Sequence, residues 1–429
     1  MSISTKWFSN KYTALHGTND LWVAFSGGID SRVLLELAYQ YTKLFSNYKL
    51  HAIHINHGLH KNSDDWARHC SDVCKTLGIP LYVLPIKLDI QPGQSLEAIA
   101  RQARRTIWEN LLPANATLLL AHHAQDQAET ILYRLFRGAG PTGLSGMAEA
   151  KIFGKGILLR PLLNVAKADS DEFAEQNKLI WIVDDSNANI KFDRNFIRHI
   201  IIPTLCKRWP KVVDNIRRGG ELCAETAELV NADSQALLNN LTGTVAGTLS
   251  ISKLLAITET QCFTVIRAWL ANNNCQMPSR SQLYRIKREV MLANSDVKPM
   301  LNFTQYKIRR YRDDLYLLVN EECFKKENFF VAINPPQEIL LANGKIIKIK
   351  ETTGCGFMLP DNSKGIAIYI GSHGEKAKKI FQQHNIPLWQ RQKYPLIFYE
   401  NRLICIVGLW LKPNFITTPG KSGLTMSML

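Results

Sequence analysis

The chain has 429 residues, a length typical of roughly two to three domains. Hydrophobic residues make up 46% of it, enough for well-packed cores, but no apolar run reaches the roughly 20 residues of a membrane-spanning helix. Residues 1–6 lack the charged and then apolar pattern of a secretory signal. These features exclude a membrane protein and predict a cytoplasmic location with no membrane partner.

Charge and cysteine content narrow the class further. The formal net charge is +15 at pH 7, which favours a polyanionic partner, although many basic enzymes simply carry solvated lysines. The nine cysteines are scattered and form no Cys-x-x-Cys pair. This pattern indicates free thiols in a reducing compartment.

Apolar strands and amphipathic helices alternate over residues 21–121. Strands are predicted at 21–25, 50–55, 81–86 and 117–121, and helices at 33–45, 64–77 and 96–112, the last capped by Ser95. Helices of this length between strands predict an α/β fold with a doubly wound parallel sheet. Ligands bind such sheets at the carboxyl ends of the strands, so residues after the first, second and fourth strands should line one crevice.

A glycine-rich turn, Ser26-Gly27-Gly28-Ile29-Asp30-Ser31, joins the first strand to the next helix. Its glycines let successive N–H groups point at one anion, and the helix N-terminus adds partial positive charge. Asp30 would repel a bare phosphate, so we expect Mg2+ between its carboxylate and the phosphates of ATP. The Walker sequence is absent, which disfavours ordinary phosphoryl transfer. The alternative is a plain turn between a strand and a helix.

This turn resembles that of the PP-loop ATP pyrophosphatases, whose fold is adenine-nucleotide α-hydrolase-like. They cleave ATP between its α and β phosphates and adenylate an oxygen, which a nucleophile then replaces. The resemblance implies that ATP contacts the whole turn, which comprises Ser26, Gly27, Gly28, Ile29, Asp30 and Ser31. It also implies that Asp30 is catalytic and is the Mg2+ ligand.

A second motif runs from His122 to Thr130, after the fourth strand. Asp126 and Glu129 are three residues apart and share a helical face. An ordinary acidic first turn that complements the helix dipole is the alternative. The stretch resembles the His-His-x-Asp-Asp-Gln-x-Glu-Thr motif of the bacterial tRNA(Ile)-lysidine synthetases, with Gln125 where aspartate is usual. The resemblance implies catalytic roles for Asp126 and Glu129, and a nucleotide contact for His123.

Two further segments match the same family. Asn56-His57-Gly58-Leu59 follows the second strand, which implies that His57 lies beside the nucleotide. Glu97, Arg101 and Arg104 fit a Glu-x-x-Ala-Arg-x-x-Arg pattern, and Arg104 is expected to be catalytic through the phosphates or an adenylated intermediate. The alternative for Glu97 and Arg101 is a simple i,i+4 ion pair.

The glycines from Gly138 to Gly143 match Gly-x-Gly-x-x-Gly but follow a helix, so they are not a dinucleotide fingerprint. We expect Gly138 to end that helix and the segment to form a flexible loop over the crevice. The family carries a matching glycine segment at this place.

Two segments are expected to bind tRNA. Residues 184–187 followed by 193–199 resemble the family, and the side chains assigned to RNA there are Arg194, Asn195 and Arg198. Near the end, a basic helix and the Trp389-x-Arg391 pair resemble the family's C-terminal domain, with Lys376, Lys378, Lys379 and Arg391 as the RNA contacts. A solvated basic surface is the alternative for the lysines.

The resulting domain prediction has four parts. They are a PP-loop ATP-binding catalytic domain at 1–215, a linker helix at 216–238, a small helical domain at 239–325, and a small α+β tRNA-binding domain at 330–429. The sequence contains no internal repeats.

The family resemblance implies a ligase that acts on isoleucine tRNA with a CAU anticodon. ATP would adenylate the C2 oxygen of the wobble cytidine, and the ε-amine of L-lysine would replace AMP to form lysidine. Lysine titrates near 10.4, so its deprotonation near neutral pH costs roughly 4 kcal/mol, and Asp126 is the expected general base.

There are three alternative functions. A thiolase is disfavoured because Cys-x-x-Cys is absent, and an N-terminal amidotransferase because Ser2 stands where a cysteine nucleophile would be. A non-catalytic RNA-binding protein clamped by ATP remains the different-class alternative. The sequence leaves open whether the chain forms a homodimer.

Overall fold

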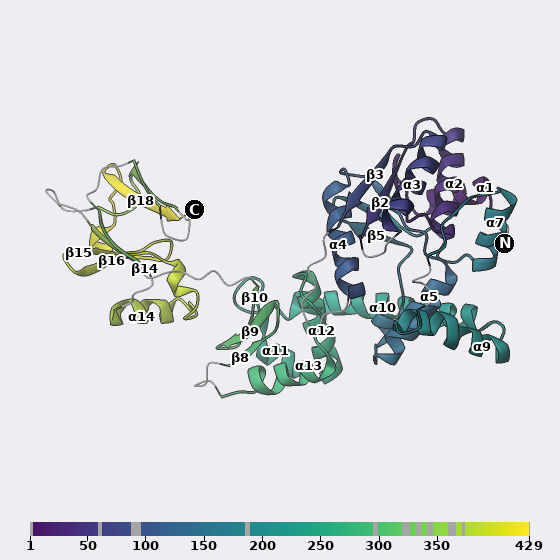
Figure 1. Cartoon of the computed structure of the whole chain (residues 1–429). Helices are drawn as coiled ribbons and strands as arrows, with labels where there is room; N and C mark the ends of the chain where they lie inside the picture. The colour runs from purple at the N-terminus through teal and green to yellow at the C-terminus, as the bar shows by residue number, and fades with distance from the viewer. Residues whose placement is uncertain are drawn as a thin grey trace. The chain divides into compact units, whose positions relative to one another are not determined.

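The computed structural model describes residues 3–58, 62–86, 96–184, 189–294, 299–319, 327–331, 336–340, 346–358, 366–370 and 374–428. Ser95, Leu59 and residues 185–187 lie outside this part, as does the side chain of Glu97. The chain forms two compact units, Met1–Asp233 and Ser234–Leu429 (Figure 1). Within the described residues, no helix has both the length and the apolar character needed to cross a bilayer.

A six-stranded sheet forms the centre of the first unit, in the order β3-β2-β1-β4-β6-β5. Its first five strands in this order are parallel, and β5 is antiparallel to β6. The bounds are β1 Asp20–Ala24, β2 Lys49–Asn56, β3 Leu81–Pro85, β4 Thr117–Leu119, β5 Ala150–Phe153 and β6 Gly156–Leu159. The four predicted strands are confirmed, whereas β5 and β6 were not predicted.

Alternating side chains of the sheet enter two cores. Leu21 and Val23 pack with the helices α1 (Thr5–Ala14), α2 (Ile29–Leu44), α3 (Ser63–Leu77) and α7 (Lys167–Gln176). Trp22 and Leu118 belong to a separate core that includes residues of α4 (Leu96–Leu111). Because β1 sends successive side chains to opposite faces, helices cover both, and the predicted doubly wound α/β fold is confirmed.

The helix α2 begins at Ile29, earlier than the predicted position 33, because the glycine turn itself leads into the first helical turn. The helix α5 (Ala124–Phe136) follows β4 and ends before Gly138, whose φ of 72° matches the expected stop. A short helix, α6 (Pro141–Leu144), occupies the glycine segment.

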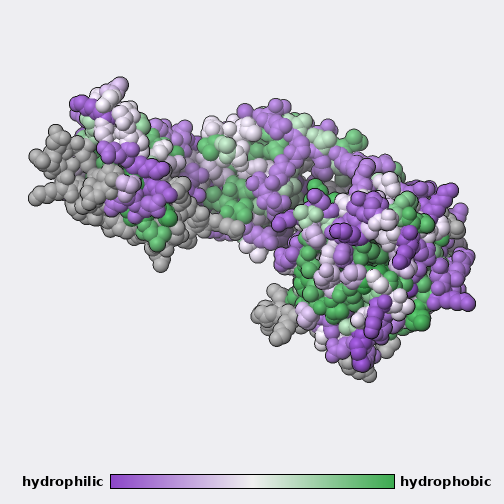
Figure 2. Space-filling model, turned by 90° about the horizontal axis from the view of Figure 1, so that it is seen from above, coloured by the Kyte–Doolittle hydropathy of each residue, from purple (hydrophilic) through white to green (hydrophobic). Residues whose placement is uncertain are grey.

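The residues after Asp193 pack against α5. The short α8 (Asp193–Phe196), a π-helical turn at Ile197–Ile201 and α9 (Ile202–Arg208) bury Ile197 and Ile202 against α5. Pro203 cannot donate to the carbonyl one turn back, which accounts for the wider π turn just before it. The long helix α10 (Val212–Asn240) comes next. On the face of this unit seen in Figure 2, hydrophilic residues border a hydrophobic area.

The second unit begins with helices, as predicted, and adds a sheet that was not predicted. The helices are α11 (Ile251–Ala256), α12 (Glu259–Asn272), α13 (Arg280–Arg285) and a π turn at Ile286–Met291. The sheet has the order β7-β10-β9-β8, formed by Leu249–Ser250, Asp314–Val319, Tyr306–Tyr311 and Met300–Asn302. In β9, buried Tyr306 and Ile308 alternate with half-buried Lys307 and Arg309, the two-residue period of a strand, although the sequence predicted a helical domain here.

The C-terminal part is α+β, as predicted. One sheet has the order β11-β14-β15-β16-β17 and the other β12-β13-β18. The strands span Glu327–Val331, Ile366–Ile370, Leu396–Tyr399, Arg402–Ile406 and Trp410–Leu411 in the first sheet, and Gln337–Leu340, Ile346–Thr353 and Ser422–Met428 in the second. The basic helix α14 (Glu375–Gln383) buries Ala377, Ile380 and Phe381.

Candidate active site

The glycine turn lies at the carboxyl end of β1, between β2 and β4, at the point where the strand order reverses. The Ser31 hydroxyl donates to the carbonyl of Gly28 at 2.8 Å and lies 3.1 Å from the Ser26 hydroxyl. The Gly28 N–H points back to Ser26 Oγ at 3.4 Å. No side chain caps the N-terminus of α2, so its first-turn N–H groups can bind an anion.

Gly27 is required at its position for two reasons. Its φ is 88°, in the left-handed region that favours glycine. A Cβ there would also lie 2.5 Å from Ile182 Cδ1 and 3.0 Å from Cys70 Sγ. The Ile182 N–H donates to the Gly27 carbonyl at 2.9 Å, so a distant segment of the chain stabilises the conformation of the glycine turn.

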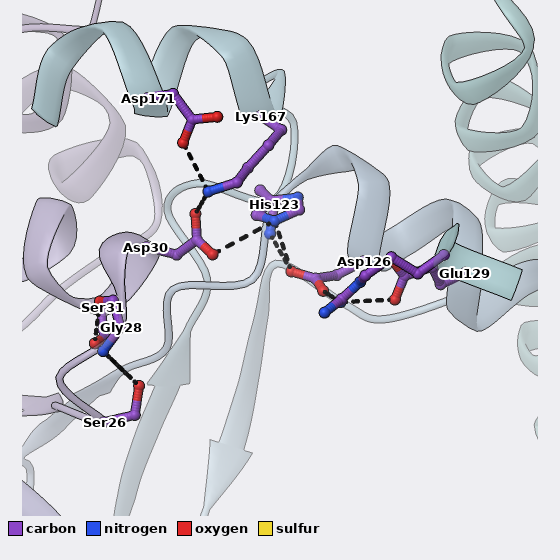
Figure 3. A network of polar contacts seen from close by, with 10 residues as sticks. Ser26, Gly28, Asp30, Ser31, His123, Asp126, Glu129, Lys167 and Asp171 are labelled. Atoms are coloured by element: carbon purple, nitrogen blue, oxygen red, sulfur yellow. Dashed lines mark hydrogen bonds and ion pairs between the residues drawn. The ribbon is translucent and has the colours of Figure 1, made fainter. Parts of the chain in front are cut away.

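Asp30 lies in the first turn of α2 and forms an ion pair with a lysine. Lys167 Nζ, at the start of α7, is 2.7 Å from Asp30 Oδ1 and 2.8 Å from Asp171 Oδ1 (Figure 3). Within the described residues, no group of three or more His, Cys, Asp or Glu side chains is arranged to hold a metal ion. Proteins often hold Mg2+ with one or two carboxylates together with substrate phosphates, and Asp30 offers one carboxylate beside the uncapped N-terminus of α2.

His123 lies between the two acidic positions. Its Nε2 is 3.7 Å from Asp30 Oδ2 and 3.5 Å from Asp126 Oδ2, and its backbone N–H donates to Asp126 Oδ2 at 3.0 Å (Figure 3). The side chain is only 5% exposed. This arrangement brings three of the predicted site residues, from α2 and α5, into one connected group.

Arg198 completes the group from the other side. Its guanidinium donates to Asp126 Oδ1 at 2.8 Å and to both oxygens of Glu129 at 2.7 and 2.8 Å. Burial would raise the pKa of Asp126, but His123, whose backbone N–H also donates to it, and Arg198 lower it. Burial raises the pKa of Glu129 even though Arg198 opposes this change. In this structure the Arg198 guanidinium is paired with both carboxylates. Its predicted tRNA contact stays a prediction.

Arginine side chains lie near His122 and His57. Arg160 donates to His122 Nδ1 at 3.2 Å and to the Ala148 carbonyl at 2.6 Å. Burial, together with Arg160, Arg194 and Arg101, lowers the pKa of His122 to about 3 although Asp126 opposes this. Burial lowers the pKa of His57, and the charge of Arg104 on α4 adds to the shift. Both imidazoles are therefore neutral at physiological pH.

The remaining predicted RNA contacts of the first unit lie beside α5. Arg194 is half-buried, and its guanidinium is 3.4 Å from Thr130 Oγ1. The Asn195 amide donates to the carbonyl of Asn189 at 3.0 Å. Gln125 is half-buried, whereas Asp126 one residue later is buried.

The C-terminal residues divide into two kinds. Lys376, Lys378 and Lys379 are exposed on α14. Arg391 is only 4% exposed, donates to the Ile386 carbonyl at 3.1 Å and covers the ring of Phe381. Its burial supports a structural role and does not support the predicted tRNA contact.

Sequence reasoning missed Lys167 and Arg160. Arg160 directly follows β6, and Lys167 comes soon after it. Because β6 pairs in parallel with β4, residues after β6 reach the same edge as His122 and Asp126. Recognising a fifth parallel strand at 156–159 would therefore have pointed to both residues.

Comparison with known families covers most of the chain. Residues 3–205 match the PP-loop domain, residues 249–316 the TilS substrate binding domain, and residues 362–428 the TilS substrate C-terminal domain.

Three curated relatives, all described as tRNA(Ile)-lysidine synthase, are each 36% identical to the chain. The relative from Vibrio cholerae aligns over 91% of this chain and 90% of its own. The corresponding shares are 94% and 92% for Coxiella burnetii, and 96% and 95% for Edwardsiella ictaluri.

Proposed function

The chain belongs to the tRNA(Ile)-lysidine synthase family, and on that premise we propose which of its residues carry out lysidine formation on tRNA. The enzyme is an ATP-dependent ligase. In the proposed reaction, the C2 oxygen of the wobble cytidine in a CAU anticodon attacks the α-phosphorus of ATP and pyrophosphate leaves. The ε-amine of L-lysine then attacks C2, the C–O bond to AMP breaks, and the nitrogen loses a proton.

ATP binds with its phosphates on the glycine turn and the first turn of α2. The uncapped N–H groups of α2, the hydroxyl pair Ser26 and Ser31, and the left-handed Gly27 support this assignment. Asp30 would hold Mg2+, which neutralises phosphate charge when it is bound. Neutral His57, with Arg104 close enough to lower its pKa, fits the side of the nucleotide.

Asp126 is the proposed binding partner of the ε-ammonium. Its lowered pKa keeps it a carboxylate at neutral pH, so it attracts the cation and orients it. It can accept the ammonium proton within hydrogen-bond reach, but a carboxyl with a lowered pKa does not keep it, so the proton passes on to water. Glu129 is fully buried and acts through Arg198, as a positioning residue.

The observation that carries this proposal is the connected chain Asp30–His123–Asp126, which joins the predicted metal ligand to the predicted lysine-binding carboxylate. In an adenylation followed by amine attack, ATP and the ε-amine of lysine must both reach the same cytidine. A site with only a structural ATP clamp has no need for a buried carboxylate such as Asp126 linked through His123 to Asp30.

Incubating the protein with ATP, Mg2+, labelled L-lysine and total tRNA, followed by mass analysis of nucleosides, tests the function. Lysidine in the digest and one AMP released per lysine incorporated are expected. In a parallel incubation with sulfide in place of lysine, a rise in a thiolated nucleoside above its level in the untreated tRNA would support the thiolase alternative. Binding of tRNA without AMP release would support the non-catalytic clamp. The same sample, analysed by sedimentation, determines whether the chain is a homodimer.

A further inference from the structure

Lys167 is an ionisable residue at the nucleotide site that the reaction described above does not use. Its ammonium bridges Asp30 at the start of α2 and Asp171 in α7, at 2.7 and 2.8 Å (Figure 3). Both Lys167 and Asp30 side chains are 29% exposed, so solvent and ligand can reach the pair. Burial would lower the pKa of Lys167, but Asp30 and Asp171 together raise it, and the side chain stays charged.

The stability of α7 does not explain a lysine at this place. Lys167 is the first residue of the helix, where a cation opposes the helix dipole. A lysine four residues before an aspartate is also the weaker order for such a pair.

Packing between α7 and α2 does not require the ion pair either. Buried Phe173 and Ala174 already join α7 to the apolar core that contains α2. An ion pair between partly exposed groups adds little to stability. A functional reason for Lys167 is therefore favoured.

The position of its ammonium supplies that reason. It donates to Asp30 Oδ1 at 2.7 Å, so a Mg2+ ion that arrives with ATP at the same carboxylate would repel it. The flexible four-carbon stem of lysine lets the ammonium move while its root on α7 stays fixed. The acceptors that arrive next to Asp30 with ATP are phosphate oxygens on the uncapped end of α2.

We propose that Lys167 is a movable cation of the nucleotide site, which holds Asp30 before ATP arrives and then pairs with the phosphates that leave as pyrophosphate. This inference rests on the proposed function, because it assumes that ATP binds to the glycine turn. It makes Lys167 an additional ligand for the triphosphate, contributed by α7 and not by the turn itself. A charge-assisted hydrogen bond of this kind strengthens binding and stabilises the leaving group.

Direct binding tests the proposal without catalysis. The probe is α,β-methylene ATP with Mg2+, which cannot be cleaved between its α and β phosphates, and affinity is measured by titration calorimetry. Lys167→Met should weaken binding by about tenfold or more, the usual effect of losing a charge-assisted hydrogen bond. Lys167→Arg should stay within a few fold of wild type. The control Lys75→Met, at an exposed lysine in the last turn of α3, removes the same charge and should change nothing.

Lys167→Gln provides a second variant in case the methionine variant folds poorly, and thermal unfolding without ligand checks both. Unchanged or tighter binding by folded Lys167→Met or Lys167→Gln would overturn the proposal, because it would mean that the ammonium only competes with Mg2+. Failure of wild-type protein to bind the analogue at all would instead overturn the proposed ATP site.

Discussion

Asp30, Asp126 and Glu129 are all carboxylates of one site, yet their surroundings give them different chemistry. Asp30 is partly exposed and pairs with the Lys167 ammonium. Asp126 is held by His123 and Arg198, which keep it ionised, whereas Glu129 is fully buried and has a raised pKa. Substitutions at these three carboxylates should therefore change different properties of the protein.

Asp30→Asn should abolish AMP formation, because the amide cannot hold Mg2+ against the pyrophosphate. Its affinity for tRNA should stay within a few fold of wild type, since the proposed RNA contacts lie elsewhere. AMP release and filter binding of tRNA measure the two properties on the same sample. AMP release near the wild-type rate would show that Asp30 is not the metal ligand.

Asp126→Asn should lower the rate of lysidine formation by about 100-fold or more, the scale of a lost general base. Gln125→Asp should keep activity, because position 125 is half-buried next to the motif and has no assigned role. Single-turnover rates with saturating lysine compare the two variants. Equal losses would mean that the carboxylate role has been assigned one residue away from its true place.

Arg198→Met should destabilise the fold by about 3 kcal/mol, the usual cost of leaving a buried charge without its partner. A carboxyl whose folded pKa is raised above its unfolded pKa contributes stability that is present at low pH and lost as pH rises. In the variant, the loss in free energy of unfolding should therefore be largest near pH 7, where Glu129 would carry an unpaired charge. It should shrink at acidic pH, where Glu129 is protonated.

Chemical unfolding of this variant at several pH values measures that trend. Adding Glu129→Gln to Arg198→Met should restore much of the lost stability, because it removes the uncompensated charge. A deficit that is the same at all pH values, with no rescue by the second change, would contradict the assigned pair.

At the scale of elements, α14 has an apolar face that packs against the protein and a basic face that is exposed. Ala377, Ile380 and Phe381 attach the helix to the C-terminal core, whereas Lys376, Lys378 and Lys379 face outward. Arg391 looked similar in the sequence but serves the inner face by covering Phe381. Only the outer residues can neutralise phosphates.

Changing Lys378 and Lys379 together to alanine should weaken tRNA binding, because each lysine that neutralises a phosphate adds roughly 0.7 to 0.9 to the slope of log affinity against log salt. The slope should thus fall by about one to two units. Filter binding of tRNA at several salt concentrations measures this slope. The same change at the exposed lysines Lys6 and Lys75 is the matched control. An unchanged slope in the α14 variant would identify a merely solvated surface.

For the molecule as a whole, the nucleotide residues and the α14 lysines belong to different compact units. Effects at sites without shared partners add within about 0.5 kcal/mol. Combining Asp30→Asn with the two α14 substitutions should therefore give the tRNA affinity of the lysine variant alone. Coupling well beyond this limit in the binding titrations would mean that the two units communicate in the absence of catalysis.

The sequence by itself determined the parallel sheet and the place of its motifs. Strand and helix periods are local, and the carboxyl ends of parallel strands meet at one edge, so the glycine turn and the His122–Asp126 segment had to meet. Only the tertiary structure decided which side chains touch. The contact between Lys167 and Asp30 joins residues 137 positions apart, and that between Arg198 and Asp126 joins residues 72 positions apart. Arg391 likewise turned inward because packing of α14 and not local charge fixed its direction, and no periodic pattern records such contacts.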